Sequence, residues 1–521
     1  MRVSTYEIIL PLIGSDEQPI EGKRLLVNGL YGSVDVVDES TATRLLGNNL
    51  DELPVPARER LAARGHITRK TPQEEQDDVS LLGNVYDRTL ARSETTLAIL
   101  PTYDCNFRCP YCFESHRLAR GQEWLSRRMR PEMVEATFGG LQKMQDEGYR
   151  INACMLYGGE PLMEGNEDVV RNICAHAHQM GLKITAVTNG YDLEGYLDLL
   201  EEFEFSRLQV TVDGVGEQND CRRRHRDGVP TYDRIMSNVR LALDRGVNVQ
   251  LRVNVNRDNI NGIPDLIADL TARGLTDSKY EGSDTEERRG SFSYYFKAVS
   301  EDPSSPTRVT EQEVMDAIVA TGIPPIEALD LQSQYSMAMG NLEEMATKER
   351  YPICHNTYCG AESGALVVDP EGKVHACWDL VGMDVDSVGY VDEESKRFAY
   401  GFAKARWRLR TSTRMEACMV CPYVFLCRGG CASDARRESG SLFHEHCGEF
   451  PEIFAYVAPR VMGRRWEKDG NDELSVSLYG PLSRMTPEER NELMTTTSGK
   501  RAVELLRQTE LVRTKEYPES Q

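Results

Sequence analysis

The residues of this sequence with the clearest chemical potential are its fourteen cysteines, most of which fall into groups. Cys105, Cys109 and Cys112 stand in the segment CNFRCPYC with CxxxCxxC spacing. A four-iron cluster normally takes four cysteinate ligands, so a compact loop with three thiolates leaves one iron open to a substrate or cofactor. The alternative interpretation of this spacing is a zinc or electron-transfer site that borrows a distant fourth cysteine.

Eight further cysteines lie in the carboxyl-terminal part of the chain, and they supply two complete sets of four thiolates. Two closed, all-cysteine four-iron clusters need that number, although two tetrahedral zinc sites would use it equally well. Gly372 precedes one of these cysteines in a GxxxxC step. The eight are Cys354, Cys359, Cys377, Cys418, Cys421, Cys427, Cys431 and Cys447.

The elements that must position the first motif form a regular alternation that begins at Thr96. Six apolar, strand-like runs alternate with segments whose apolar residues recur every three or four positions, as in amphipathic helices. The runs are TLAILPT, NACMLY, KITAVT, RLQVTV, NVQLRVNV and SFSYYFKAV. Right-handed parallel crossovers would wind six such units into a partial, TIM-like (β/α)6 barrel. We therefore expect an α/β fold class.

Polar residues bounded by glycine follow three further strands of this predicted barrel. The segments are Gly158-Gly159-Glu160-Pro161, Thr188-Asn189-Gly190 and Thr211-Val212-Asp213-Gly214. Because barrel enzymes carry their chemistry at the carboxyl ends of the strands, these segments are expected to share one rim with the CxxxCxxC loop. GGEP alone predicts only a turn, whereas four coincident strand ends indicate a ligand site.

The CxxxCxxC loop after the first strand, followed by GGEP after the second, resembles the radical S-adenosylmethionine (radical SAM) superfamily. In that family the methionine part of the cofactor chelates the open iron, and cleavage of its sulfonium gives a 5′-deoxyadenosyl radical that abstracts a substrate hydrogen. The resemblance implies that the CxxxCxxC thiols hold this cluster and that Gly158, Gly159 and Glu160 bind the methionyl amino group. NDCRR stands where relatives have HDxxR, so Arg223 is expected to meet the cofactor carboxylate, although Asn219 replaces the usual His.

Other cofactor contacts follow from the same resemblance. The backbone near Tyr111 would meet the adenine, and Thr211 and Asp213 match a Ser-x-Asp pattern on the ribose side. Asn254 on the fifth strand lies where a further contact is common. Asn189 ends the third strand on the same rim.

The order of the carboxyl-terminal cysteines resembles the SPASM extension of radical SAM peptide modifiers. By that resemblance, one set of four holds the first auxiliary cluster and an interleaved set holds the second. The first set is Cys354, Cys359, Cys377 and Cys431. The second set is Cys418, Cys421, Cys427 and Cys447. The implied cofactors are S-adenosyl-L-methionine and three [4Fe–4S] clusters.

A candidate catalytic base lies beside the GxxxxC cysteine. Sulfatase-maturating members of the family carry a catalytic Asp directly after that cysteine, whereas here Trp378 follows Cys377 and Asp379 comes next. On an extended chain, a shift of one residue turns a side chain to the opposite face. This shift counts against Asp379, which is nevertheless the candidate base, with a solvated or structural carboxylate as the alternative.

The pattern along the chain predicts five parts, with TPQEEQDDVS (71–80) as a solvated boundary near the end of the first. An α+β module would precede the barrel, and a helical linker, the cysteine-rich SPASM domain and a helical extension would follow it. Their ranges are 1–92, 93–312, 313–349, 350–450 and 451–521. The first module resembles in outline the leader-recognition element of peptide maturases, which adds a peptide as a strand to a sheet edge. A packing cap over the barrel is the alternative.

Bulk composition limits the classes of partner. The formal net charge of -22 argues against nucleic acid or an anionic membrane, because a phosphate backbone needs a basic footprint. No run resembles a signal peptide or a membrane span. Fourteen cysteines without an export signal are typical of a reducing, cytoplasmic compartment, where clustered thiols usually bind metal.

These features together predict a radical SAM enzyme that acts on a ribosomally made precursor peptide and forms a thioether or carbon–carbon cross-link. A reductant such as flavodoxin or ferredoxin is the second expected partner. An anaerobic sulfatase-maturating enzyme, which makes formylglycine, is the first alternative. A non-catalytic iron–sulfur or zinc protein is the second, and it leaves the GGEP rim unexplained.

Overall fold

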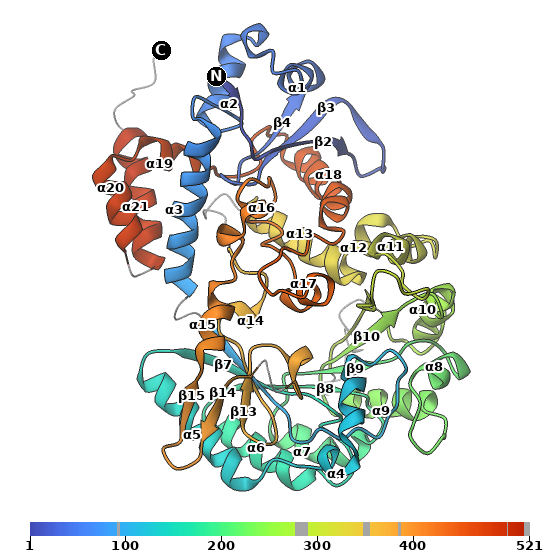
Figure 1. Ribbon diagram of the computed structural model, residues 1–521. Coiled ribbons are helices and arrows are strands. Elements are labelled where there is room, and N and C mark those ends of the chain that lie inside the picture. Colours follow the sequence, from blue (N-terminus) through green and yellow to red (C-terminus); the bar gives the residue numbers. More distant parts are fainter. Residues whose placement is uncertain (91–93, 277–289, 347–354, 384–386, 497–498, 515–521) are drawn as a thin grey trace. The chain divides into compact units, whose positions relative to one another are not determined.

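The computed structural model describes residues 1–90, 94–276, 290–346, 355–383, 387–496 and 499–514 (Figure 1). The chain divides into two compact units, each built from separate stretches of sequence. The first unit comprises Met1–Ala91, Gln334–Cys359 and Arg410–Gln521. The second unit comprises Arg92–Ser333 and Gly360–Leu409.

The second unit contains the predicted barrel strands in one sheet. Neighbouring strands are parallel and follow chain order, as successive crossovers in one direction require. The strands are β6 (Glu94–Ile99), β7 (Arg150–Leu156), β8 (Lys183–Thr188), β9 (Arg207–Thr211), β10 (Val249–Val255) and β11 (Phe292–Ala298). The structure confirms the α/β fold class and all six expected strands.

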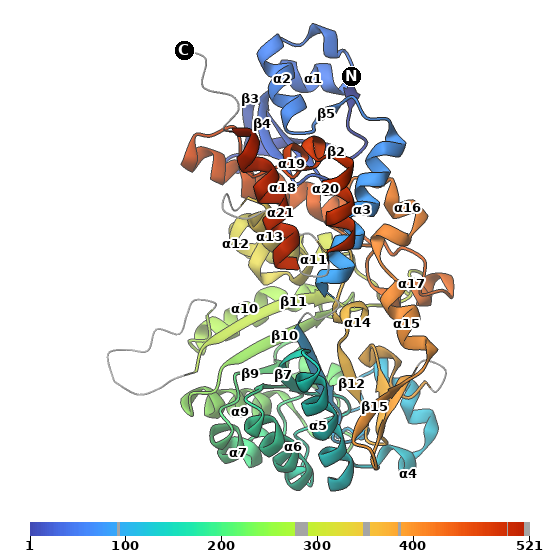
Figure 2. The same ribbon diagram turned by 90° about the vertical axis from the view of Figure 1, so that its left-hand side faces the viewer.

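Helices between these strands cover the outside of the sheet (Figure 2). Their apolar faces are buried, as in α6, where Val170, Ile173 and Ala177 are fully covered. The longer helices are α5 (Pro131–Asp146), α6 (Glu167–Gln179), α9 (Tyr232–Asp244) and α10 (Ile263–Ala272). Shorter elements between the strands are η2 (Phe113–Arg120), α4 (Gln122–Leu125), η3 (Leu193–Tyr196), α7 (Leu197–Glu202), α8 (Glu217–Arg222) and η4 (Ile260–Gly262). Helices α11 (Glu311–Val319) and α12 (Pro325–Leu331) follow β11.

Residues 360–409 extend the barrel sheet beyond β6. Strand β12 lies parallel to β6, and three further pairings are antiparallel, which gives a ten-stranded sheet. The added elements are α14 (Gly360–Ser363), β12 (Leu366–Val368), β13 (Lys373–His375), η5 (Trp378–Leu380), β14 (Ser387–Asp392), β15 (Arg397–Tyr400) and α15 (Phe402–Leu409). The cysteine-rich segment 350–450 is thus distributed over both units.

The first unit begins with a three-stranded antiparallel sheet in the order β2-β3-β4. Its elements up to residue 90 are β1 (Arg2–Val3), β2 (Glu7–Ile13), β3 (Pro19–Asn28), β4 (Val34–Asp38), α1 (Glu39–Leu46), η1 (Leu50–Glu52), α2 (Val55–Ala63), β5 (Ile67–Thr68) and α3 (Pro72–Leu90). The expectation of a solvated boundary at 71–80 is wrong, because α3 covers most of this range. Glu75 and Asp78 are buried there against the cations of Arg2 and Lys70.

The amino-terminal module shares a hydrophobic core with the carboxyl-terminal part of the chain. Tyr6, Tyr31 and Val79 pack in one cluster with Phe425 and Leu482. The later elements of this unit are α13 (Ser333–Met345), η7 (Ser412–Arg414), α16 (Glu416–Met419), α17 (Ala432–Ser439), α18 (Phe450–Asp469), α19 (Tyr479–Arg484), α20 (Pro487–Thr495) and α21 (Gly499–Thr514). Within the described ranges, no helix combines the length and apolar character that a bilayer crossing requires.

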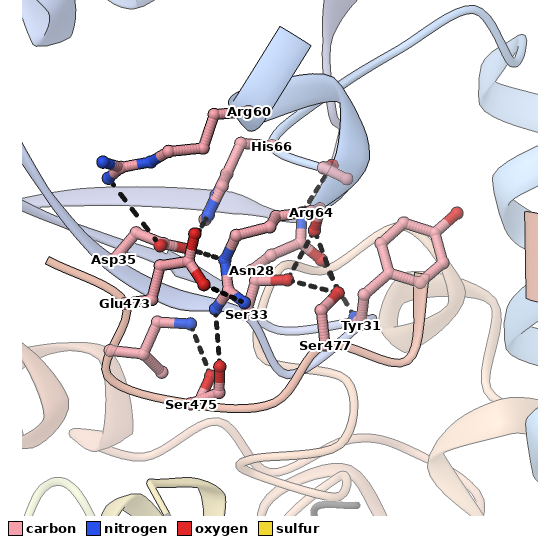
Figure 3. Close-up of polar contacts among 12 residues, drawn as sticks. Asn28, Tyr31, Ser33, Asp35, Arg60, Arg64, His66, Glu473, Ser475 and Ser477 are labelled. Atoms are coloured by element: carbon pink, nitrogen blue, oxygen red, sulfur yellow. Dashed lines mark hydrogen bonds and ion pairs between the residues drawn. The ribbon is translucent and has the colours of Figure 1, made fainter. Parts of the chain in front are cut away.

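Residues 472–478 run along the outer edge of β4 (Figure 3). Asp35 and Glu473 form an antiparallel bridge, and the amide of Val36 donates to the carbonyl of Asp472 at 2.8 Å. The Ser475 hydroxyl accepts from the amide of Val34 at 2.8 Å and donates to the carbonyl of Gly32 at 2.6 Å. The chain's own later segment therefore occupies one edge of the amino-terminal sheet.

Candidate active site

The CxxxCxxC loop leaves the sheet at the carboxyl end of β6, and its three thiols are half-buried. Burial raises the pKa of Cys105 well above its usual range, and the neighbouring Glu160 carboxylate and Cys109 thiol add to this. Burial and Glu114 raise the pKa of Cys112 to about 12. Without a bound cation these groups are neutral thiols, so metal binding would have to displace their protons.

The GGEP segment fixes the position of this loop through backbone contacts. Gly159 has a φ of 54°, and a Cβ atom there would lie 2.2 Å from the carbonyl oxygen of Asp104. The amide of Glu160 donates to the same carbonyl at 2.8 Å. Only glycine combines this approach with this φ, because any side chain would collide with backbone.

Glu160 is a buried carboxylate, 2% exposed, that ties β7 to β8. It accepts from the Thr188 hydroxyl at 2.6 Å and from the amides of Asn189 and Leu162 at 2.5 and 2.9 Å. Burial nevertheless raises the pKa of Glu160 to about 7. A carboxylate has about four acceptor positions, and these three bonds use three of them.

Tyr111, Asp213 and Arg223 meet in one buried network. The Tyr111 hydroxyl donates to Asp213 in a short hydrogen bond and accepts from Arg223 at 2.9 Å. Burial raises the pKa of Tyr111 well above its usual range, and Asp213 adds to this. The strand ends after β6 and β9 are joined by side chains that the sequence pointed to separately.

The other predicted contacts surround this network in different ways. The amide of Asn254 donates to Asp213 at 2.9 Å, so Asn254 supports the network through its backbone. The Asn189 amide group donates to Asn106 at 2.6 Å, inside the cysteine loop. Thr211 is buried at the end of β9. The structure thus gathers the expected residues on one rim, and their cofactor roles remain predictions.

Glu114 and Arg117, which sequence reasoning missed, link the cysteine loop to the segment after Cys377. Glu114 accepts from the amide of Gly159 at 3.0 Å and pairs with Arg117 at 2.8 Å. Arg117 is 1% exposed and donates to the carbonyl of Trp378 at 3.2 Å. The available signal was the presence of these two charged residues within five positions of Cys112, the last cysteine of CPYC.

Asp379 is half-buried in the 3₁₀ helix η5. The assumption of an extended chain at this point is wrong, because a 3₁₀ helix turns successive side chains by about 120° rather than to opposite faces. Trp378 packs against Tyr157, which follows β7, with ring centroids 5.2 Å apart and ring planes tilted by 32°. Asp379 itself helps to raise the pKa of Tyr157, which burial already raises. Its role as a base remains a prediction.

The second auxiliary set belongs entirely to the first unit. Burial and the thiols of Cys427, Cys421 and Cys447 raise the pKa of Cys418 to about 12. Burial, and after it the thiols of Cys447 and Cys421, raise the pKa of Cys427 to about 12. All four cysteines belong to the first unit, and their role as the ligands of one cluster remains a prediction.

The first auxiliary set is distributed over both units. Cys354 lies outside the described residues, and Cys377 belongs to the second unit. Cys359 and Cys431 belong to the first unit, and both contribute to the raised pKa of Tyr358, of which burial is the main cause. The ligand assignment of this set remains a prediction.

The donor chemistry of the rim fits an iron–sulfur cluster and S-adenosylmethionine. The ligands that the loop motif offers are three thiols, without a nitrogen or carboxylate ligand. Thiolates are the ligand type that four-iron clusters take. The Gly158-Gly159 turn leaves backbone rather than side chains beside the loop. In the part of the chain that the structure describes, no three His, Cys, Asp or Glu side chains converge closely enough for a single metal ion.

Comparison with known proteins identifies the class of this domain. Residues 99–270 match the family model described as the radical SAM superfamily, so the chain contains a radical SAM domain. GTP 3′,8-cyclase of Nautilia profundicola is 29% identical over 168 residues, which are 32% of this chain. The match spans only about half of that relative, 47% of its length.

Two further similarities extend beyond the radical SAM domain. The cysteine-type anaerobic sulfatase-maturating enzyme of Clostridium perfringens is 21% identical over 372 residues, covering 69% of this chain and 94% of that protein. The solved structure "Native anSMEcpe with bound AdoMet and Cp18Cys peptide" has a TM-score of 0.52 and 18% identity, covering 71% of this chain and 98% of the other. At this identity the structural likeness concerns the fold alone.

Proposed function

We propose that this protein is a radical SAM enzyme that modifies a ribosomally made precursor peptide and forms a thioether or carbon–carbon cross-link. The observation that carries the proposal is the convergence of the CxxxCxxC loop, Glu160 and the Tyr111–Asp213–Arg223 network on one rim of the barrel. A structural role alone would not require a glycine turn, three thiols and a buried charged network at successive strand ends.

The residues in named roles are those of the rim. Cys105, Cys109 and Cys112 would hold the cluster, and Glu160 and Arg223 would bind the two charged ends of the methionine part. When bound, the cluster and S-adenosylmethionine supply a 5′-deoxyadenosyl radical that removes hydrogen from an unreactive carbon. The remaining contacts with the cofactor would come from Gly158, Thr211, Asn189, Asn254 and the Tyr111 backbone.

The contribution of the chain itself is to orient and shield these groups. Asp213 is 1% exposed and Arg223 is 7% exposed, so their charges act at low dielectric, where they attract a zwitterionic ligand strongly. Tyr111 holds both groups in place before a ligand arrives. Such preorganisation lowers the cost of binding, because the polar groups do not reorganise.

A peptide substrate is supported by the neighbour anSMEcpe, whose solved structure has AdoMet and a Cp18Cys peptide bound. The auxiliary cysteines support it as well, since their order resembles that of peptide-modifying SPASM enzymes. Two auxiliary [4Fe–4S] clusters would bring the total to three, and a flavodoxin or ferredoxin would supply electrons. With all these ligands loaded, about twelve irons per chain are expected.

The similarity to the sulfatase-maturating enzyme of Clostridium perfringens favours a second candidate function, formylglycine formation in a target sulfatase. Trp378 stands at the position where those enzymes have their catalytic Asp, and this difference counts against formylglycine formation. The position of Asp379 on a 3₁₀ turn weakens that objection, because the carboxylate is not forced to the opposite face. The substrate assay below separates the two functions.

The amino-terminal module is proposed to capture the leader of the precursor as an added strand. Because residues 472–478 occupy the β4 edge, the added strand would pair with β2, which among the described residues pairs only with β3. The amide of Gly29 donates to the carbonyl of Tyr6, so the alternate residues Glu7, Ile9 and Pro11 direct their backbone outward. Because Pro11 has no amide hydrogen and the Glu7 amide already donates to Ser4 at 3.3 Å, the added strand would depend on the amide of Ile9 and on the outward carbonyls.

The test begins with S-adenosylmethionine cleavage by the anaerobically reconstituted full chain. Replacement of Cys105, Cys109 and Cys112 together by Ala should abolish formation of 5′-deoxyadenosine. Cys221→Ala is the matched control, because this thiol is exposed and stands in none of the cysteine motifs. Cleavage that survives the triple change would refute the assignment.

The substrate is tested with a short precursor peptide encoded beside the gene and with a sulfatase peptide. A mass loss of two hydrogens in the precursor supports the cross-linking function. Formylglycine in the sulfatase peptide, with an unchanged precursor, would establish the alternative function instead.

A further inference from the structure

A cavity of about 480 Å³ lies in the second unit, where α5, β15 and α15 meet the first residues of β6. The cavity wall includes Thr95, near the start of β6, and Tyr149, which directly precedes β7. The cavity is therefore at the amino-terminal end of these strands. The CxxxCxxC loop leaves the opposite, carboxyl-terminal end of β6. The cavity is therefore separate from the radical SAM rim.

The cavity is basic, although the whole chain has a formal net charge of -22. Its wall carries four cations and a single carboxylate, Glu147. Two of the cations already have partners, since Arg397 pairs with Glu147 at 3.0 Å and Lys143 donates to the carbonyl of Ser395. The other two are Lys404 and Arg408, one turn apart on α15.

Lys404 and Arg408 are an unfavourable pair in the absence of a ligand. Like charges at positions i and i+4 of a helix destabilise it, and partial burial makes their repulsion stronger. Burial and the Arg408 guanidinium lower the pKa of Lys404 to about 7. Across the described ranges, neither side chain pairs with a carboxylate. The Tyr400 ring, 3.5 Å from the Lys404 amine, attracts the cation but accepts no conventional hydrogen bond.

The backbone around this pair provides space for it. Gly364 has a φ of 122°, and a Cβ atom there would lie 2.8 Å from an Arg408 guanidinium nitrogen. Gly140 in α5 allows the Phe398 ring to approach, because its Cβ would lie 2.9 Å from that ring. The remaining walls are apolar or aromatic, with Met144 among them.

We propose that this cavity binds an organic anion, whose carboxylate or phosphate group lies between Lys404 and Arg408 and whose apolar body packs against the aromatic wall. An oxyanion would compensate both cations at once, with charge-assisted hydrogen bonds from the amine and the guanidinium. The volume is that of a small-molecule site rather than of a single inorganic ion.

The binding test uses calorimetric titration of the cluster-loaded full chain with four probes: phenyl phosphate, phenylacetate, inorganic phosphate and the uncharged phenylacetamide. The two aromatic anions should bind, inorganic phosphate should bind more weakly, and phenylacetamide should not bind. Tighter binding of phenyl phosphate would assign a phosphate-bearing ligand, and tighter binding of phenylacetate a carboxylate-bearing one. Equal binding of phenylacetamide, or no saturation by any anion up to about 10 mM, would overturn the proposal.

Variants locate the site. Lys404→Gln and Arg408→Gln should each weaken binding of the better anion at least about tenfold. Lys396→Gln is the matched control, since it removes the same charge from the same region but from outside the cavity wall, where Lys396 pairs with Glu135. Unchanged binding in both cavity variants would overturn the assignment.

A stability measurement separates a binding role from a structural one. Lys404→Met should leave the ligand-free melting temperature unchanged or raise it, because it removes one of two repelling cations while keeping the apolar stem. Ligand should raise the melting temperature of the wild type and not that of the variant. A lower melting temperature in Lys404→Met, without any ligand effect in the wild type, would show a structural role and overturn the proposal.

Discussion

Asp35 and Glu473 face each other in an antiparallel bridge, although one residue belongs to the amino-terminal sheet and the other follows helix α18. Arg64 contacts both carboxylates, because it donates to Asp35 and lies 3.8 Å from Glu473 (Figure 3). The two ends of the chain are therefore parts of one folded unit. The proposed leader-binding module cannot be removed without exposing the core that it shares with residues 424–506.

Ser475 provides the first test of this relationship. Its buried hydroxyl bonds to two backbone groups of the β3–β4 region, so Ser475→Ala should lower the free energy of unfolding by about 1–3 kcal/mol. Thermal unfolding measures the loss, and hydrogen exchange should accelerate at the amides of Val34 and Val36. Ser483→Ala is the control, because that side chain is exposed. Equal stability of the two variants would contradict the pairing of residues 472–478 with β4.

The approach of Gly159 to Asp104 gives a second prediction. Gly159→Ala would place a methyl group 2.2 Å from the Asp104 carbonyl oxygen and displace the cysteine loop. Since a misplacement of about 1 Å can cost about 100-fold in rate, S-adenosylmethionine cleavage should fall by about that factor. Gly165→Ala is the matched control. Gly165 also has a positive φ, 89°, but no atom lies within 4 Å of the position that its Cβ would take. If both variants cleave equally, the contact is not what positions the loop.

The sequence predicted the barrel well and the contacts between distant segments poorly. The six strands and their polar ends follow from local periodicity, and the CxxxCxxC and GGEP motifs follow from local spacing. Both kinds of feature can therefore be recognised in a single sequence. Arg117 could not be linked to Trp378 in this way, because nothing in either segment specifies a contact across 260 residues of chain. Strands β12–β15 were missed for the same reason. Whether such short segments form strands depends more on the strands they pair with than on their own sequence.

The bridging role of Tyr111 gives a third prediction. Tyr111→Phe removes the hydroxyl that bonds to both Asp213 and Arg223, while the ring and the cysteine loop stay in place. We expect iron content to be unchanged and the affinity for S-adenosylmethionine to fall at least about tenfold, the cost of unpairing a hydrogen bond to a charged group. Equilibrium dialysis measures the affinity. Tyr191→Phe is the control, because the Tyr191 ring packs against Phe107 and His225 and its only hydrogen bonds in the described region use backbone atoms. An affinity loss of the same size in both variants would indicate general loosening of the rim.

His66 makes the stability of the first unit depend on pH. Its ring is fully buried, with Nδ1 2.8 Å from Glu7 and Nε2 2.6 Å from Asp35. Burial opposes the charged ring, but the two carboxylates outweigh it and raise the pKa of His66 to about 9 from an ordinary value of 6.5. A group whose pKa is higher in the folded than in the unfolded protein stabilises fully below the unfolded value, and this stabilisation is lost as the pH rises through the folded value. The melting temperature should therefore fall between about pH 6.5 and pH 9, with a loss of at most about 3 kcal/mol from this group.

Glu7→Gln removes one of the two carboxylates and should flatten this slope, whereas Glu21→Gln makes the same change at an exposed site and should leave it intact. A slope that is the same in all three proteins would exclude His66 as its source.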